Sequence, residues 1–468
     1  MNAIILSAIF GVVLMMASAF VSNRSLYKTI ALACLVLLVG ANIAETLGYS
    51  FFTIDTHNML AFNKMGLFFN TICFTATLLY VFISSSEIER VDNYTAEYFA
   101  LIFFSLCGIA ILTSFNNLLM MFLGIEIMSI PLYILTGSDK RNLKSNEAAL
   151  KYFLMGSFST GILLLGIAFI YGATGSFGLE SIKVGTLQMQ LSILEVTGCI
   201  LLLIAFAFKV SAAPFHFWTP DVYDGAPSVF TSFMASIIKV AGFYAFVKLF
   251  ESRIETTSFA TNPAVGVNWH LLFAILIIAT LFVGNITAVF QQSVKRMLAY
   301  SSIAQAGFML FALFSVNAFS KEGLYLYAAG YCLATIGIFA VLVRMKDYTF
   351  EGFNGLAKHE PTLAFATTVC LLSLAGIPLT VGFFAKYFML AAVVKQGYAW
   401  LAIVGVLFAG VSIYYYFRVI AAMYFKSADE NPAAVATSST VKIGLAVVVA
   451  GIIILGVWPH ALLNFLYF

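Results

Sequence analysis

Apolar segments of about 20 residues recur along the whole chain, separated by short polar breaks. A helix of about 20 apolar residues is long enough to cross the hydrocarbon core of a bilayer. The pattern therefore predicts an all-α polytopic membrane protein with about fourteen transmembrane helices. They are expected at 3–22, 28–47, 66–86, 96–114, 117–137, 147–172, 193–215, 227–250, 270–291, 296–317, 323–344, 361–395, 399–425 and 440–462.

Two of these helices are expected to be broken. The segment 361–395 is longer than a straight crossing needs, and Gly376-Ile377-Pro378 interrupts it. The seventh segment, 193–215, contains Pro214 near its end. Proline removes a backbone donor and clashes with the preceding turn, so a helix usually ends or kinks before it. The sequence therefore predicts breaks in the seventh and twelfth helices.

Composition supports a membrane environment. The chain is 62% hydrophobic and 10% charged, and its mean hydropathy is +0.99. Soluble domains are about 45–50% apolar and about 25% charged. The net charge of +3 is too small to indicate a nucleic-acid partner. We expect contacts with membrane lipids, and an uncleaved first helix, because no cation precedes Arg24 as a signal peptide would require.

The distribution of cations orients the predicted helices. If the N-terminus lies outside, the cytoplasmic loops carry about twice as many lysines and arginines as the opposite loops. Both termini are therefore expected on the periplasmic side, and residues 138–149 and 345–360 on the cytoplasmic side. The six cysteines form no C-x-x-C pair and the five histidines no H-x-x-x-H pair. We expect no metal, cofactor or redox centre in this chain.

Four charged residues fall near the centres of predicted helices: Glu126, Lys209, Lys239 and Lys386. Each costs about 2.5–3.5 kcal/mol on insertion scales, and such residues commonly mark proton pathways. Structural roles remain open, since Glu126 could pair with any nearby lysine and Lys209 and Lys386 could bind carbonyls released at the proline breaks. Lys239 lies about 16 Å from either helix end, too far to reach water easily. It is the best candidate for a titrating amine.

Three further residues are possible secondary relays. Lys151 lies about two turns into its helix, for which Ser145 is the expected N-cap. A side chain at this depth can extend to the water at the membrane surface, so a structural role explains the Lys151 charge as well as a relay role does. His216 follows Pro214 and could relay protons or serve as an interfacial structural residue. A carboxylate about 5 Å from a lysine contributes about 3 kcal/mol at an effective dielectric near 20. Movement of Glu126 could therefore control proton release from Lys209, although the sequence leaves their distance open.

Four segments together resemble one family. They are GIEIMSIPLYIL at 124–135, KVSAAPFHFWTPDVYDGAP at 209–227, SVKRMLAYSSIAQAGF at 293–308 and AGIPLTVGFFAKYF at 375–388. The chain resembles, over nearly its whole length, the antiporter-like membrane subunits of respiratory complex I (NADH-quinone oxidoreductase) and of multisubunit cation/proton antiporters. Two features favour the N-type subunits: the chain ends without a long lateral helix, and Lys386 stands where M-type subunits usually carry glutamate.

The resemblance implies an architecture and roles for these residues. It implies two inverted five-helix repeats, helices 4–8 and 9–13, within one membrane domain. The expected divisions are 1–95 for three N-terminal helices, 96–250 and 270–425 for the repeats, and 440–462 for a last helix. Glu126 and Lys209 would form a switching pair, Lys239 the central relay, and Lys386 the residue facing the outer half-channel. Gln305 is a departure, because many relatives have histidine there and an amide does not titrate.

The implied function is proton translocation by a membrane subunit of a bacterial complex I in the inner membrane. Electron transfer from NADH to quinone would occur in other subunits, which would hold the flavin and iron–sulfur clusters. Expected partners are the antiporter-like subunit M and small subunits such as K and J. The alternative from another class is a subunit of a multisubunit cation/proton antiporter without electron transfer. A purely structural membrane scaffold is a third hypothesis.

Overall fold

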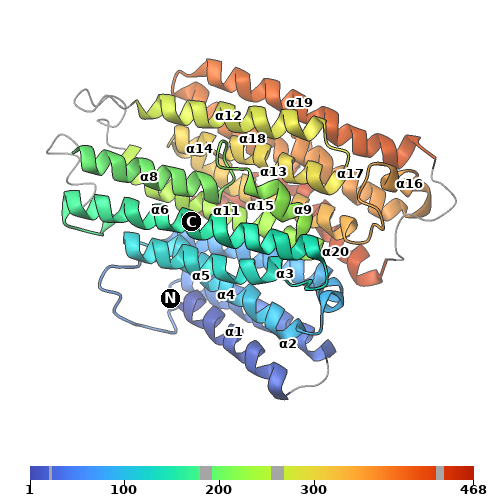
Figure 1. The fold of residues 1–468 in the computed structure, drawn as a ribbon, viewed down its shortest axis with the longest axis horizontal. Helices are drawn as coiled ribbons and strands as arrows, with labels where there is room; N and C mark the ends of the chain where they lie inside the picture. The colour runs from blue at the N-terminus through green and yellow to red at the C-terminus, as the bar shows by residue number, and fades with distance from the viewer. Residues whose placement is uncertain (21–23, 180–191, 255–267, 428–436, 468) are drawn as a thin grey trace.

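The structure is a computed structural model that describes residues 1–20, 24–179, 192–254, 268–427 and 437–467. Its helices lie side by side in one bundle with their axes roughly aligned (Figure 1). The first half contains α1 (Asn2–Phe20), α2 (Arg24–Thr46), α3 (Lys64–Val91), α4 (Thr95–Ser114), α5 (Leu118–Thr136), α6 (Leu143–Thr174), α8 (Ile193–Lys209), α9 (Trp218–Gly225), α10 (Ser228–Phe233) and α11 (Lys239–Ile254). The second half contains α12 (Trp269–Val289), α13 (Val294–Met309), α14 (Phe311–Phe314), α15 (Ala318–Leu342), α16 (Leu356–His359), α17 (Pro361–Ala375), α18 (Val381–Lys395), α19 (Ala399–Phe425), α20 (Ser439–Val457) and α21 (His460–Tyr467).

Twelve helical spans among the described residues are long and apolar enough to cross a membrane. This confirms the predicted all-α polytopic membrane fold. The two broken helices, α8 with α9 and α17 with α18, are not among the twelve. Counting each broken helix as one crossing would give fourteen, and that count remains a prediction.

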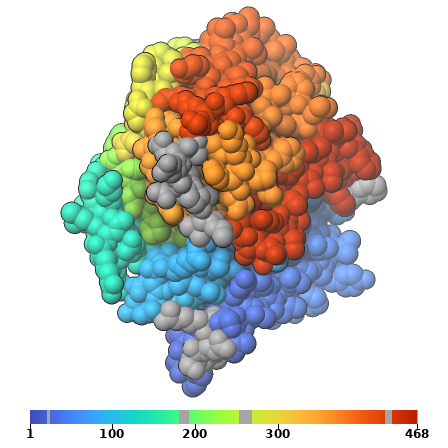
Figure 2. Space-filling view, turned by 90° about the vertical axis from the view of Figure 1, so that its right-hand side faces the viewer, coloured from blue at the N-terminus to red at the C-terminus, as the bar shows by residue number. Residues whose placement is uncertain are grey.

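Burial is very uneven across the bundle. In the span Ser228–Glu251, 94% of the most apolar window is buried, and the same holds for Val294–Phe314. In α1 only 22% is buried, so most of its apolar side chains face outward. The end view shows the N-terminal helices at one margin of the bundle and the later helices stacked beyond them (Figure 2). The helices that carry Lys239 and Gln305 are therefore among the most enclosed elements.

Both predicted breaks are present. The helix expected at 193–215 ends earlier than predicted, at Lys209, because the chain leaves the helix at Val210 and Ser211 has a left-handed φ of 65°. In Figure 1, α8 and α9 lie toward opposite ends of the bundle. In the twelfth helix, α17 ends at Ala375 and Gly376 adopts a φ of +86°, a conformation that glycine tolerates far better than other residues.

Two local features differ from the sequence-based expectation. The span Ser228–Glu251 contains a π-helical turn, Met234–Ile238, immediately before Lys239. Such turns have no clear sequence signature and are frequent at functional sites. In addition, α6 begins at Leu143, where Asn142 accepts a hydrogen bond from the Lys144 amide at 3.0 Å. The expected cap, Ser145, instead donates to the Thr136 carbonyl at 2.7 Å.

Glycines allow two helix pairs to approach backbone to backbone. A Cβ atom on Gly108 of α4 would lie 2.4 Å from the Met128 amide nitrogen of α5. A Cβ atom on Gly284 of α12 would lie 2.5 Å from the Ala304 amide nitrogen of α13. In each pair a polar residue lies two positions before the contact, Glu126 on α5 and Ser302 on α13. The close contacts fix the positions of α5 and α13, which both carry residues of the candidate site.

Candidate functional site

Lys239 lies at the start of α11, directly after the π-helical turn, and is only 3% exposed. Its Nζ atom donates to the Ser302 carbonyl oxygen at 2.9 Å and to Ser302 Oγ at 2.8 Å. The Tyr223 ring centroid lies 5.8 Å from Nζ. These contacts are all with uncharged groups, and no ion pair among the described residues includes Lys239. The amine is buried as the sequence predicted, without an acidic partner that would hold its proton.

Lys386 lies within α18 and is 6% exposed. Its Nζ atom donates to the Leu374 carbonyl at 2.8 Å and to the Ala375 carbonyl at 3.0 Å, in the last turn of α17. The Phe308 ring centroid lies 4.5 Å away. A cation at the C-terminus of a helix interacts favourably with the free carbonyls and the helix dipole. The structural role left open by the sequence, binding carbonyls released at the break, is therefore present at Lys386.

Gln305 lies beside Lys386 and shares an acceptor with it. Its Nε2 atom donates to the Leu374 carbonyl at 2.8 Å and to the Tyr416 hydroxyl at 3.1 Å. The Tyr327 hydroxyl donates to Oε1 of the same amide. With both ends of the amide bound, Gln305 has a fixed orientation. It supports the environment of Lys386 but has no group that titrates.

Lys209 is the last residue of α8, and its Nζ atom donates to Ser129 Oγ on α5. Ser129 lies one turn after Glu126, and its hydroxyl donates to the Ile125 carbonyl. Lys209 therefore contacts α5 one turn from Glu126, but the two side chains form no direct ion pair among the described residues. The structure places both residues of the predicted switching pair in the same region, with the Ser129 hydroxyl as the partner of Lys209, and the switching role remains a prediction.

The carbonyls at the end of α8 are bound by other donors. The Trp218 indole donates to the Phe208 carbonyl at 3.0 Å, and the Ala212 amide donates to the Ala207 carbonyl at 2.7 Å. The alternative that Lys209 satisfies these carbonyls is therefore not what the structure shows. The Lys209 stem instead lies near Gly242 of α11, where a Cβ atom would be 4.0 Å from its Cγ. Gly242 is one turn beyond Lys239, so the two lysines lie along neighbouring parts of one interface.

Lys151 takes part in an ion-pair network with two carboxylates and an arginine. Its Nζ atom lies 2.7 Å from a Glu147 carboxylate oxygen and 2.9 Å from one of Asp221. Arg296 of α13 lies 3.0 Å from the other Asp221 oxygen. Lys151 is about one-third exposed, so partial solvation accounts for its charge. The network joins α6, α9 and α13, but among the described residues no hydrogen bond or ion pair connects it directly to Lys209, Lys239 or Lys386.

His216 lies between α8 and α9 and is half-buried. Among the described residues, the His216 imidazole forms no hydrogen bond with Lys209, Lys239 or Lys386. The structure places it in the break of the seventh helix, where the sequence predicted it. Its relay role remains a prediction.

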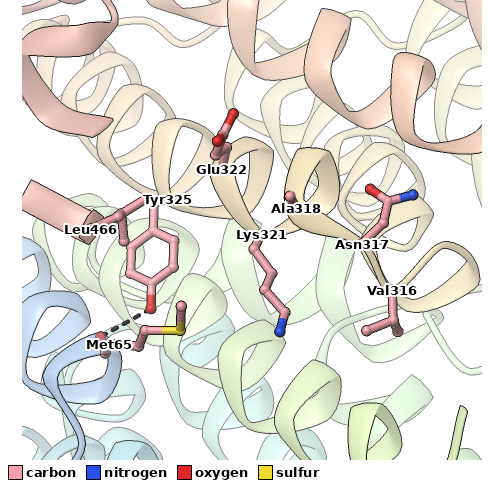
Figure 3. A pocket seen from close by; sticks show the side chains of 8 residues that line it. All are labelled: Met65, Val316, Asn317, Ala318, Lys321, Glu322, Tyr325 and Leu466. Carbon is pink, nitrogen blue, oxygen red and sulfur yellow. Dashed lines mark hydrogen bonds between the residues drawn. The ribbon is translucent and has the colours of Figure 1, made fainter. Parts of the chain in front are cut away.

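Two small cavities accompany the lysines, and a larger one lies elsewhere. Cavities of about 10 Å³ are found beside Lys209 and beside Lys386. The larger cavity, about 310 Å³, lies at the beginning of α15 and is lined by Asn317, Lys321 and Tyr325. Figure 3 shows the Tyr325 hydroxyl donating to the Met65 carbonyl, at 2.9 Å, across this cavity. Lys321 forms an ion pair with Glu251 of α11. The larger cavity contains none of the four central charges.

Comparison with known proteins decides the family. Residues 115–412 match the family model described as NADH:quinone oxidoreductase/Mrp antiporter, transmembrane. The chain is 41% identical over 475 residues to NADH-quinone oxidoreductase subunit N of Cytophaga hutchinsonii, covering 99% of each chain. This chain belongs to the NADH-quinone oxidoreductase subunit N family. The resemblance inferred from the four motifs is confirmed.

Solved structures support the same fold. This chain is similar to a chain of respiratory complex I from Thermus thermophilus with bound Aureothin, with a TM-score of 0.83 and 29% sequence identity. That match covers 99% of this chain and 98% of the other. A chain of the Mrp complex from Dietzia sp. has the same TM-score at 18% identity, with 99% and 95% covered, and shows a similar fold alone.

Sequence reasoning missed several polar residues of this subunit N family member. Ser129 contacts Lys209, Ser302 contacts Lys239, and the Tyr327 and Tyr416 hydroxyls hold Gln305. Ser129 lies one turn from Glu126, and Ser302 one turn from Gln305, so helical spacing from the predicted residues could have found both. The tyrosines come from α15 and α19, distant in sequence, and only the folded structure brings them to the site.

Proposed function

We propose that this chain is the proton-translocating membrane subunit of a bacterial NADH-quinone oxidoreductase. Lys239 carries the proposal, because its amine is buried in one of the most enclosed spans and contacts uncharged groups alone. Holding a permanent charge there is costly, whereas an amine that gains and loses a proton needs no fixed partner. The membership of the subunit N family supports the assignment to that complex.

The proposed route runs across the bundle through three lysines. Glu126 and Ser129 adjust the proton affinity of Lys209 on α8. The aliphatic part of the Lys209 side chain lies near the turn of α11 that follows Lys239. Lys239 binds Ser302 on α13, and α13 also carries Gln305, which shares the Leu374 carbonyl with Lys386. Lys386 then faces the outer half-channel. Each lysine passes a proton when a change in its surroundings favours the neutral amine.

The internal repeats are part of the same proposal. Helices 4–8 and 9–13 form two inverted repeats within 96–250 and 270–425, flanked by 1–95 and 440–462. The matched approaches of Gly108 to Met128 and of Gly284 to Ala304 support this division, because they join the first two helices of each repeat at corresponding places. The two proline-broken helices occupy corresponding positions, as the seventh and twelfth helices.

The orientation proposed from the cation distribution places both termini on the periplasmic side of the bacterial inner membrane. Lys140 and Lys346 are exposed at the expected cytoplasmic loops. Cysteines introduced singly at these positions should react with a membrane-impermeant maleimide in inverted vesicles, where the cytoplasmic face is outside. Reaction from the periplasmic side of intact cells would contradict this topology.

The partners and cofactors follow from the same assignment. The subunit contacts the antiporter-like subunit M and small subunits such as K and J, and electron transfer from NADH to quinone takes place elsewhere in the complex. This chain itself holds no redox centre. The likeness to the Mrp complex concerns the fold alone, and the identity of 41% to a subunit N favours the oxidoreductase over a free-standing antiporter.

The proposed function is tested by removing the central amine. Lys239→Ala keeps a good helix former and removes the cost of a buried charge, so the complex should assemble. Proton uptake per NADH oxidised, measured in vesicles and normalised to assembled complex, should fall well below the wild-type value. An assembled Lys239→Ala complex with the wild-type ratio would refute the proposed role of this residue.

A further inference from the structure

The hydrogen bonds of Lys239 and Lys386 stop short of each other. Lys239 ends at Ser302, and Lys386 ends at the carbonyls of Leu374 and Ala375. Carbonyl oxygens accept hydrogen bonds but have no proton to pass on. A proton route between the two lysines therefore needs hydroxyl groups or water in the space between Ser302 and Lys386.

Tyr331 of α15 occupies this space. It is only 4% exposed, so its hydroxyl is enclosed within the bundle. Tyr331 also lines the small cavity that Lys386 lines. Tyr331 therefore borders the same cavity as the Lys386 amine and as Gln305, which lies one turn after Ser302 on α13.

The chemistry of the groups fits a relay. Ser302 Oγ accepts a hydrogen bond from Lys239 at 2.8 Å and keeps its own hydrogen free for a further acceptor. The cavity beside Lys386, about 10 Å³, is at the lower limit for one water molecule, and its walls include Gln305 and the Tyr327 side chain. Polar walls of this kind supply the hydrogen bonds that a buried water needs.

We propose that Ser302 and Tyr331 carry the proton between Lys239 and Lys386, with one water molecule in the Lys386 cavity completing the path. The inference rests on the proposed function. In the transfer, Lys239 changes from ammonium to amine as Ser302 Oγ takes its proton and releases its own to the Tyr331 oxygen. Tyr331 releases its proton to the water, and the water passes one to the neutral amine of Lys386. Every hydroxyl and the water end unchanged, and one proton has moved.

Gln305 has a different part in this arrangement. Its amide is bound by Tyr327, Tyr416 and the Leu374 carbonyl, so it fixes one wall of the cavity and shares the acceptor of Lys386. It exchanges no proton along the path. Tyr331 and Ser302 are the groups whose hydroxyls the path requires.

The test removes single hydroxyl groups in the assembled complex. Tyr331→Phe and Ser302→Ala should each reduce proton uptake per NADH oxidised to the level of Lys239→Ala. Because the two hydroxyls act in series, the double variant should reach the same level and no lower. Tyr80→Phe is the matched control, because Tyr80 is a fully buried tyrosine whose hydroxyl donates to the Val229 carbonyl at 3.1 Å, away from the path. It should keep the wild-type ratio.

The outcomes separate this inference from the proposed function. Loss of uptake in Lys239→Ala together with the wild-type ratio in Tyr331→Phe would overturn the hydroxyl link and leave the role of Lys239 standing. Additive losses in the double variant would also overturn the link, because they would indicate two independent paths. The wild-type ratio in Lys239→Ala would refute the proposed function itself. If the Tyr331→Phe complex does not assemble, Tyr331→Trp and Tyr331→Leu are used instead, because they also lack the hydroxyl. An assembled complex with either substitution and the wild-type proton uptake per NADH would contradict the link.

Discussion

The two broken helices each place a lysine beside the break, but they hold it differently. Lys209 reaches a serine hydroxyl on α5, while Trp218 and backbone amides bind the carbonyls at the end of α8. Lys386 itself binds the last carbonyls of α17. A side-chain hydroxyl is easily exchanged for another partner, whereas two backbone carbonyls are fixed by the fold. The first lysine is therefore free to change partners, and the second is held in place.

Glu126 sharpens this difference. Glu126 lies one turn before Ser129, the residue of α5 that Lys209 binds. The groups that contact Lys386 directly are two carbonyls and the Phe308 ring, which carry no net charge. In the proposed proton path, Lys209 would therefore act as a switch and Lys386 as a fixed station for the proton.

The largest expected effect is on the thermal stability of the complex when a buried lysine is replaced by methionine, which keeps a long side chain but has no amine. Lys209→Met and Lys386→Met both remove a buried charge. A difference in stability between the two variants therefore reports the hydrogen bonds that each lysine makes. Lys386→Met leaves the Ala375 carbonyl without this donor, at a cost of about 1–3 kcal/mol for a buried unsatisfied group. The purified Lys386→Met complex should lose this subunit at a lower temperature than the Lys209→Met complex. The reverse order would contradict the comparison.

A smaller effect is expected at Gly376, the left-handed residue that ends α17. Gly376→Ala strains the backbone by about 1–2 kcal/mol and places a Cβ atom 2.9 Å from Lys386 Cδ. Gly397→Ala is a matched control, because Gly397 has a similar φ of +88° and nothing within 4 Å of an added Cβ. Proton uptake per NADH should fall in Gly376→Ala and remain normal in Gly397→Ala. Equal values in the two variants would show that the position of Lys386 is not critical.

The smallest effect is expected from Ser129→Ala. It removes one hydrogen bond to a charged group, worth about 1.5–3 kcal/mol at most, and Glu126 offers Lys209 an alternative partner nearby. Assembly should be normal, with a partial reduction in uptake because Lys209 then keeps its proton more firmly. Glu126→Gln combined with Ser129→Ala should restore part of the lost uptake. A complete loss in Ser129→Ala alone would show that the hydroxyl carries the proton rather than exchanging with Glu126.

The sequence predicted the membrane fold, both helix breaks and the four central charges, because apolar run length, proline and intramembrane charge are local signals. It could not predict the π-helical turn before Lys239 or the early end of the seventh helix at Lys209. Neither the π-helical turn nor the early helix end is marked by a distinctive set of residues in the sequence. The partners of the lysines, such as Ser302 and the tyrosines around Gln305, come from helices distant in the chain, so tertiary packing alone selects them.

The central claim is that Lys239 works by releasing its proton, and a comparison of arginine with lysine at this position tests it most directly. Arginine keeps the positive charge and the capacity to donate to Ser302, but its guanidinium stays protonated in proteins. The measurement is proton uptake per NADH oxidised by assembled Lys239→Arg complex in vesicles. The expected ratio is as low as that of Lys239→Ala. A structural charge would instead be served by arginine, so the wild-type ratio in Lys239→Arg would contradict the account.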